Sequence, residues 1–218
     1  MEKEKEIFLI DFDITISRRD STDVLLGEHN PLLKEEIRKK YKNKEITMRE
    51  FIKTGLESLN ITKKEFLETL KKVEIDETFI DFVKSGIPFK IVSAGTKLNI
   101  TGTLDNYDIN LTNEDIISNN IEFEKNKITI TNPFLDKEEY YGVDKKEAVE
   151  NYQRQGYKVY FVGDGPSDYR AIEVADFSFI RKGTRAVKFC QENGIDFFEF
   201  DNFNEVLGYC KIIEINFE

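Results

Sequence analysis

The stretch IFLIDFDITIS, residues 7–17, places four apolar residues directly before a pair of aspartates, Asp11 and Asp13. Residues 7–11 are too short and too apolar for an amphipathic helix, so they predict a strand that is buried on both faces. Side chains on an extended strand repeat every two residues, so we expect both carboxylates to point the same way. Two carboxylates this close repel each other unless a hard cation such as Mg²⁺ binds between them.

A second group of acids lies in VGDGPSDYR, residues 162–170. Asp164 stands between Gly163 and Gly165, which favour a sharp turn and a close approach of the backbone to a ligand. Asp168 follows one helical turn later and is expected to face the same site as a supporting or water-mediated ligand. The two stretches together predict a magnesium site built from distant parts of the chain.

Apolar runs alternate with helical patterns through most of the sequence. Strands are expected at 88–93, 158–163, 177–180 and 197–200, and helices at 76–84, 145–155, 166–174 and 183–193. This alternation predicts an α/β fold with a Rossmann-like parallel sheet covered by helices on both faces. Ligands bind outside the carboxyl ends of such strands, so Asp11, Ser93 and Asp164, each at an expected strand end, should converge on one crevice.

A helical block interrupts this alternation directly after the first strand. Residues 16–72 carry apolar residues at helical spacing. Two capping boxes, which begin at Thr47 and Thr62, mark helix starts within it. The block predicts a small helical cap inserted into the sheet domain.

A second interruption lies at residues 116–131, where two β-rich runs flank the polar turn EKNK and predict a β-hairpin. We therefore expect a Rossmann-like catalytic core of residues 1–15 and 76–218 and a helical cap domain of residues 16–75.

Two further motifs are suited to phosphate. SAGT, residues 93–96, offers a hydroxyl group and backbone N–H groups near an expected helix start. GVDKKEAV, residues 142–149, supplies lysines at the start of another helix. Each motif alone has an ordinary structural explanation, as a turn, an N-cap or a solvated helix face. Their joint order, with three of them ending apolar strands, favours a shared functional site.

Composition narrows the classes of function. The 218 residues carry a net charge of −10, which argues against a nucleic-acid or anionic-membrane partner. No apolar run approaches the roughly 20 residues that span a bilayer, and the opening residues MEKEKE do not resemble a signal peptide. Cys190 and Cys210 are expected to be buried apolar groups, and two cysteines suit a reducing cytoplasm. His29 lies in a turn pattern and is expected at the surface.

In this order the motifs resemble those of the haloacid dehalogenase superfamily of phosphatases and phosphotransferases. DFDITI is similar to its first motif, VSAG to its second, a lysine of GVDKK to its third and VGDGPSD to its fourth. The hairpin at 116–131 is similar to one in the phosphoserine phosphatase-like subgroup. Within that subgroup, the tail ADFSFIRKG…DFFEFDNFNEV resembles the 2-hydroxy-3-keto-5-methylthiopentenyl-1-phosphate phosphatase branch.

The resemblance implies a role for each matching residue. Asp11 would be the nucleophile that forms an aspartyl-phosphate, and Asp13 the general acid for the leaving group and then the base for water. Thr15 would help to fix the loop. Lys145 matches the motif lysine best, with Lys146 as the alternative. The implied phosphate-binding residues are Ser93, Ala94, Gly95 and Lys145, and the implied Mg²⁺ ligands are Asp11, Asp13, Asp164 and Asp168.

Some positions bear on turn geometry and selectivity. Ile14 stands where the family commonly has glycine, so the turn geometry is expected to differ. Asp20 matches an acid of the branch named above, and Lys53 aligns with an arginine by which phosphoserine phosphatase holds its substrate's carboxylate. Arg18, Arg19 and Asp20 are expected either to select the substrate or to form a solvated linker.

The sequence therefore predicts a Mg²⁺-dependent phosphomonoester hydrolase that acts on a small phosphorylated metabolite in the cytoplasm. Two alternatives stay open at this point. One is a phosphotransferase or phosphoserine phosphatase that uses the same site. The other is a non-catalytic regulatory module on the same fold, which the presence of both Asp11 and Asp13 disfavours.

Overall fold

The computed structural model describes residues 5–212 and confirms an α/β fold. Its strands are β1 (Lys5–Ile10), β2 (Phe89–Thr96), β3 (Ile116–Glu124), β4 (Lys127–Thr131), β5 (Tyr157–Gly163), β6 (Phe177–Arg181) and β7 (Phe197–Phe200). Its α-helices are α1 (Ser21–His29), α2 (Pro31–Lys42), α3 (Met48–Glu57), α4 (Lys63–Leu70), α5 (Phe79–Lys84), α6 (Lys97–Leu104), α7 (Lys145–Arg154), α8 (Tyr169–Ile172), α9 (Arg185–Asn193) and α10 (Phe203–Ile212).

The strands follow the order β4-β3-β2-β1-β5-β6-β7, and the pairings from β2 to β7 are parallel. Only the hairpin β3–β4 is antiparallel among the registers determined for the described residues. Its strands enclose the turn that the sequence predicts. The expected Rossmann-like sheet is therefore present.

The chain divides into two compact units. The first unit consists of residues 1–16, 75–92 and 145–218, and the second of residues 17–74 and 93–144. The second unit thus combines the helical block with the segment that contains α6 and the hairpin, because β4 packs on α3 and α6 packs on α4. The predicted division into catalytic core and cap concerns function as well as packing, and it stays a prediction.

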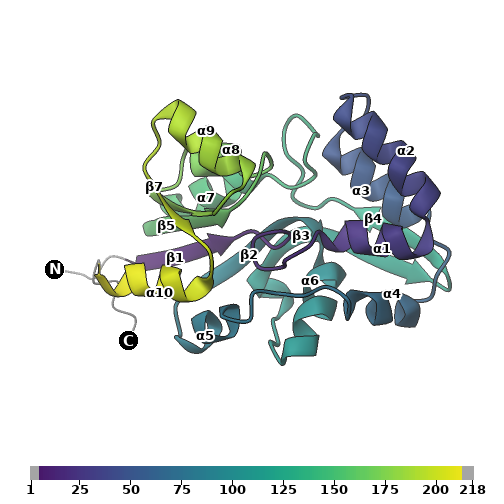
Figure 1. The fold of residues 1–218 in the computed structure, drawn as a ribbon, viewed down its shortest axis with the longest axis horizontal. Helices are drawn as coiled ribbons and strands as arrows, with labels where there is room; N and C mark the ends of the chain where they lie inside the picture. Colours follow the sequence, from purple (N-terminus) through teal and green to yellow (C-terminus); the bar gives the residue numbers. More distant parts are fainter. Residues whose placement is uncertain (1–4, 213–218) are drawn as a thin grey trace. The chain divides into compact units, whose positions relative to one another are not determined.

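In the first unit, helices α7, α8 and α9 cover one face of the sheet, and α5 and α10 cover the other (Figure 1). Phe8, Leu9 and Ile10 of β1 are completely buried between these layers, as the apolar run predicts. Phe8 stacks on Tyr160 of β5 with 4.9 Å between the ring centroids. Aromatic packing thus fixes the strand that leads to Asp11.

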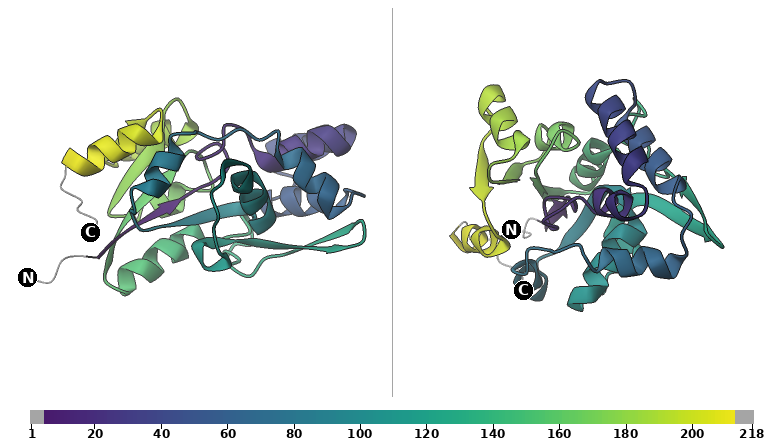
Figure 2. Two further views of the ribbon diagram at one scale, coloured as in Figure 1. Left: turned by 90° about the horizontal axis from the view of Figure 1, so that it is seen from below. Right: turned by 45° about the vertical axis from the view of Figure 1, so that its right-hand side comes forward.

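In the second unit, α2 and α3 lie side by side (Figure 2). Both predicted capping boxes form: Thr47 with Glu50 starts α3, and Thr62 with Glu65 starts α4. His29, expected at the surface in a turn, is half-buried and ends α1 instead of lying in a turn. Its Nε2 atom lies 2.7 Å from Thr69 Oγ1 on α4.

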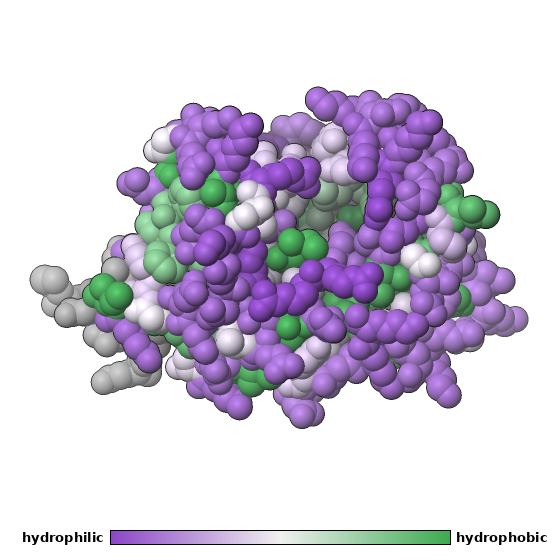
Figure 3. Space-filling view, viewed as in Figure 1, coloured by the Kyte–Doolittle hydropathy of each residue, from purple (hydrophilic) through white to green (hydrophobic). Residues whose placement is uncertain are grey.

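The molecular surface agrees with the composition. Hydrophilic side chains cover most of the face shown in Figure 3. Cys190 and Cys210 are buried, as predicted. Within residues 5–212, every helix is too short or too polar to cross a membrane.

Candidate active site

The segment after β1 forms a turn instead of a longer strand. β1 ends at Ile10, and the N–H groups of Thr15 and Ile16 both donate to the carbonyl of Phe12, at 3.3 and 2.9 Å. Asp13 is half-buried within this turn. The extended strand expected through Asp13 is therefore absent, because the backbone leaves the extended conformation after Ile10, and the direction of the Asp13 carboxylate stays a prediction.

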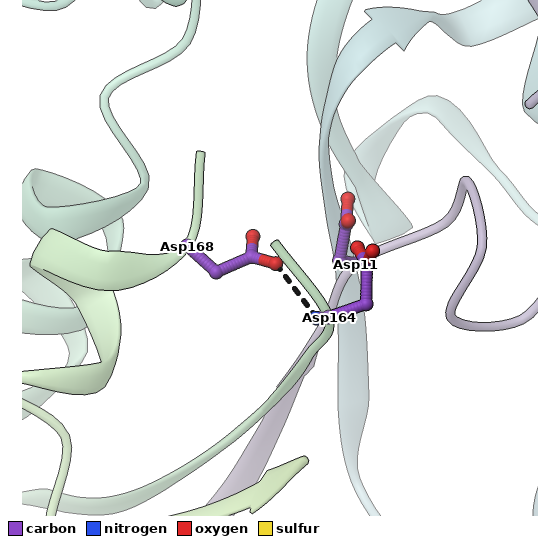
Figure 4. Close-up of side chains that lie close together, drawn as sticks. All are labelled: Asp11, Asp164 and Asp168. Carbon is purple, nitrogen blue, oxygen red and sulfur yellow. Dashed lines mark hydrogen bonds between the residues drawn. The ribbon is translucent and has the colours of Figure 1, made fainter. Parts of the chain in front are cut away.

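Three carboxylates of the first unit lie together (Figure 4). Asp11 follows β1, Asp164 follows β5, and Asp168 precedes α8, and one oxygen of each lies within 4.8 Å of the others. Asp11 donates its backbone N–H to the carbonyl of Val162, which continues the β1–β5 pairing up to the site. Within residues 5–212, this cluster does not include Asp13.

The glycine next to Asp164 has a clear steric role. Asp168 accepts hydrogen bonds from the backbone N–H groups of Asp164 and Gly165, at 2.9 and 3.0 Å. A Cβ atom at Gly163 would lie 2.6 Å from Asp168 Oδ2. Glycine is therefore needed so that the Asp168 carboxylate can fold back against the strand end.

Lys145, the first residue of α7, lies among these acids. Its ammonium group is 2.7 Å from Asp11 and 2.6 Å from Asp168, and the side chain is 1% exposed. Lys146 instead forms a partly exposed ion pair with Glu150 at 3.5 Å. Of the two lysines left open by the sequence, Lys145 is the one in contact with Asp11.

Burial and mutual repulsion perturb these acids. Burial raises the pKa of Asp11 to about 7, although the nearby Lys145 ammonium opposes the shift. Burial, with the neighbouring Asp168 and Asp11, raises the pKa of Asp164 to about 9. Burial disfavours the charged Lys145 ammonium, but Asp11 and Asp168 outweigh it and raise the pKa of this lysine.

The cluster fits a divalent cation. Three ionised carboxylates and one ammonium leave two negative charges, and burial raises the pKa of Asp11 and Asp164 despite the nearby lysine. Carboxylate oxygens are the ligands that Mg²⁺ prefers. Since Asp168 already binds Lys145 and two backbone N–H groups, Asp11 and Asp164 are the better-suited ligands.

Of the predicted phosphate-binding residues, Lys145 belongs to the first unit, and Ser93, Ala94 and Gly95 belong to the second. β2 continues to Thr96, so Ser93 lies within the strand, and its expected position at a strand end is wrong. Its Oγ accepts a hydrogen bond from Gly95 N–H at 3.1 Å, and Ala94 accepts one from the Asn119 amide at 2.6 Å. The roles of Ser93, Ala94 and Gly95 in binding phosphate stay predictions.

The residues expected to select the substrate also lie in the second unit. Asp20 is the N-cap of α1 and accepts a hydrogen bond from Asp23 N–H at 2.7 Å. Arg18 and Arg19 are exposed. Lys53 forms an ion pair with Glu57 and donates to the Ile130 carbonyl at 3.1 Å, so it joins α3 to β4.

Sequence reasoning missed one buried charge pair in the first unit. Arg181 ends β6 and binds Asp76 at 3.0 Å, and both side chains are less than a tenth exposed. An arginine at the end of the apolar run FSFIR was the available signal, since arginine is rarely buried without a partner. The sequence did not indicate that partner.

Comparison with known proteins identifies the family of this chain. Residues 8–173 match the haloacid dehalogenase-like hydrolase family. The chain is 27% identical to the polyol phosphate phosphatase PYP1 of Saccharomyces cerevisiae, over 95% of this chain and 93% of that one. It is 26% identical to the 2-hydroxy-3-keto-5-methylthiopentenyl-1-phosphate phosphatase of Bacillus pumilus, over 91% and 88% of the respective chains.

Among solved structures, a substrate-bound phosphoserine phosphatase complex superimposes with a TM-score of 0.71 at 18% identity. The match covers 95% of this chain and 99% of that one, and it shows a shared fold. The predicted family is confirmed by the match over residues 8–173. The chain belongs to the haloacid dehalogenase-like hydrolases, as a phosphatase of that family.

Proposed function

We propose that this phosphatase is a Mg²⁺-dependent phosphomonoesterase that hydrolyses a small phosphorylated metabolite through an aspartyl-phosphate on Asp11. The observation that carries the proposal is the buried Asp11 carboxylate, held by Lys145 beside Asp164 and Asp168. A carboxylate is a weak nucleophile, but it needs no separate base and divides a slow hydrolysis into two easier steps.

Each residue then has a defined task. An oxygen of Asp11 attacks phosphorus, the bond from phosphorus to the ester oxygen breaks, and Asp13 gives its proton to the leaving alcohol. Asp13 next takes a proton from water, whose oxygen attacks the same phosphorus and frees Asp11 and inorganic phosphate. Lys145 orients Asp11 and favours its ionised form. When bound by Asp11 and Asp164, Mg²⁺ would offset the charge of the phosphoryl oxygens.

The experiment is a turnover assay on the purified full chain. We expect p-nitrophenyl phosphate and a panel of phosphorylated metabolites to be hydrolysed with Mg²⁺ and not with excess chelator. Asp11→Asn should lose turnover by several orders of magnitude with an unchanged circular dichroism spectrum. When a reaction with a ³²P-labelled substrate is quenched with acid, label should stay on the wild-type protein and not on Asp11→Asn.

The matched control is Asp196→Asn, which makes the same change at an exposed position and should retain wild-type activity. Substantial turnover by Asp11→Asn would exclude the covalent route. Transfer of phosphate to added glycerol in preference to water would favour the phosphotransferase alternative.

The substrate class rests on the relatives, whose names specify a polyol phosphate and a methylthiopentenyl phosphate. We propose that Asp20 recognises a polar group of the substrate beyond the phosphate. Asp20→Ala should then lower kcat/KM for the best metabolite of the panel and barely change it for p-nitrophenyl phosphate, which lacks such a group. Equal losses on both compounds would instead reflect its capping of α1.

A further inference from the structure

Arg181 is buried in the first unit and contacts several groups at once. The side chain is 8% exposed, and its guanidinium stacks over the Phe200 ring at 4.9 Å. Nη2 donates to the carbonyl of Thr15 at 2.6 Å, and Nη1 donates to Asp76 Oδ2 at 3.0 Å and to the carbonyl of Asp201. The planar fork of arginine can serve several acceptors at once, which a single ammonium cannot.

Two of these contacts hold the end of the turn that carries Asp13. Thr15 is bound by Arg181 directly. The next carbonyl, that of Ile16, accepts a hydrogen bond from Asp76 N–H at 2.8 Å, while the Asp76 carboxylate binds Arg181. The Arg181–Asp76 pair therefore fixes the carbonyl groups of Thr15 and Ile16, which follow Asp13 in the chain.

The turn needs this support because its backbone is strained. Ile14 has φ +65°, in the left-handed region, where a β-branched residue is a rare outlier. Ile14 is 36% exposed, so packing covers only part of it. Residues in such conformations persist only where their surroundings hold them, and the family resemblance places glycine at this position.

We propose that Arg181 is a positioning residue that holds the strained turn, and thereby Asp13, in the conformation required for proton transfer. The inference rests on the proposed function in one respect, the role of Asp13. If the Arg181–Asp76 pair instead only stabilised the sheet, its loss would slow the hydrolysis of all substrates alike. If it positions the general acid, its loss will be selective for substrates that need the proton.

The test compares two artificial esters that differ in leaving group. Phenolate leaves less readily than p-nitrophenolate, so phenyl phosphate depends more on general acid catalysis. We expect Arg181→Lys to lose about tenfold or more kcat/KM on phenyl phosphate relative to p-nitrophenyl phosphate, as Asp13→Asn should. Asp76→Asn provides a second variant that breaks the pair. Lys182→Met, at the adjacent and exposed position, should change neither value by more than about twofold.

A rescue experiment separates positioning from stability. Ile14→Gly removes the strain, so in the Arg181→Lys background it should return the ratio of the two kcat/KM values toward that of wild type. Equal losses on both esters, or no effect of Ile14→Gly on the ratio, would overturn the proposal.

Hydrogen exchange gives a readout that does not depend on phosphatase activity. Backbone amides of residues 12–17 should exchange faster in Arg181→Lys than in Lys182→Met, with β5 unchanged. If wild type hydrolyses neither ester and no metabolite of the panel, the proposed function fails, and hydrogen exchange alone then tests the positioning role. Unchanged exchange at residues 12–17 in Arg181→Lys and Asp76→Asn would then refute the positioning role.

Discussion

At the scale of single residues, Lys145 is the group on which the acid cluster depends. It is the only ammonium that contacts Asp11 among the described residues. Lys145→Met would leave the buried Asp11 and Asp168 carboxylates without it, and breaking a buried ion pair in this way typically costs about 3–5 kcal/mol. We expect the free energy of unfolding, measured by urea denaturation in chelator, to fall by about this amount.

The neighbouring residue supplies the control. Lys146→Met makes the same substitution on the same turn of α7, but at a partly exposed position with one ion pair. Its effect should lie within about 0.5 kcal/mol. Similar losses in both variants would show that α7, and not the buried contact, is sensitive to the change.

The raised pKa values of Asp11 and Asp164 predict a dependence of stability on pH. Both folded-state values, about 7 and about 9, exceed the ordinary value of 3.8. The folded state therefore binds these protons more tightly than the unfolded state. Their contribution is complete below the ordinary value and is lost as the pH rises through about 7 and about 9.

Without metal, Tm should accordingly fall as the pH rises from mildly acidic to alkaline, and Asp11→Asn should reduce this dependence. Mg²⁺ binds the ionised carboxylates, so it should raise Tm more at alkaline than at acidic pH. Scanning calorimetry with and without Mg²⁺ measures both effects. If Mg²⁺ raised Tm by the same amount at all pH values, the cation would not bind to these two acids.

The sequence predicted the members of the acid cluster better than their geometry. Asp11, Asp164 and Asp168 were predictable because motif order and the parallel sheet place strand ends together. The turn that carries Asp13 was not, because it depends on where β1 ends. Arg181 was missed because its partner, Asp76, lies far away in sequence and nothing local marks the pair.

At the scale of elements, the contact of α3 with the edge strand β4 depends on Glu57. Its carboxylate accepts the Ile130 N–H at 2.9 Å, and Lys53 donates to the Ile130 carbonyl. Both free backbone groups of an edge-strand residue are thus satisfied by a helix, which also protects the edge from pairing with another chain. Glu57→Ala should cost about 1–3 kcal/mol and promote aggregation.

Urea denaturation and light scattering test this contact. Glu57→Gln keeps the acceptor oxygen and should retain most of the stability. Glu36→Ala removes an exposed α2 carboxylate paired with Lys40 and should change the free energy of unfolding by less than about 0.5 kcal/mol. If Glu36→Ala were as harmful as Glu57→Ala, the backbone contact would not be the cause.

Elements with strong local signals were predicted well. The capping boxes fixed the starts of α3 and α4, and the polar turn fixed the hairpin β3–β4. The end of β2 was misplaced, because its buried polar residues Ser93 and Thr96 look like the start of a loop. Burial of polar side chains within a strand depends on tertiary partners that local sequence does not show.

At the scale of the whole molecule, the second unit has a core made from two separate segments. Leu56, Phe66 and Leu70 from its helices form one cluster with Ile128 and Ile130 of the hairpin. Residues 17–74 alone would expose this apolar surface. We expect that fragment to lack a cooperative unfolding transition, as measured by circular dichroism in urea.

A fragment that joins residues 17–74 to 93–144 through a flexible Gly/Ser linker contains both halves of the cluster. It should unfold cooperatively. Cooperative unfolding of residues 17–74 on their own would show that the helical block needs no contribution from the hairpin.

The position of β1 has a consequence for synthesis on the ribosome. The strand emerges before both of its partners, since it pairs with β2 on one side and with β5, about 150 residues later in the sequence, on the other. Until residues 157–162 are translated, an apolar segment with strong β propensity has an unpaired edge in the nascent chain. Glu6 and Asp11 flank its apolar run with charge, so we expect them to disfavour association with other nascent chains. We therefore expect the aspartate proposed to attack phosphate to reduce aggregation of the nascent chain as well.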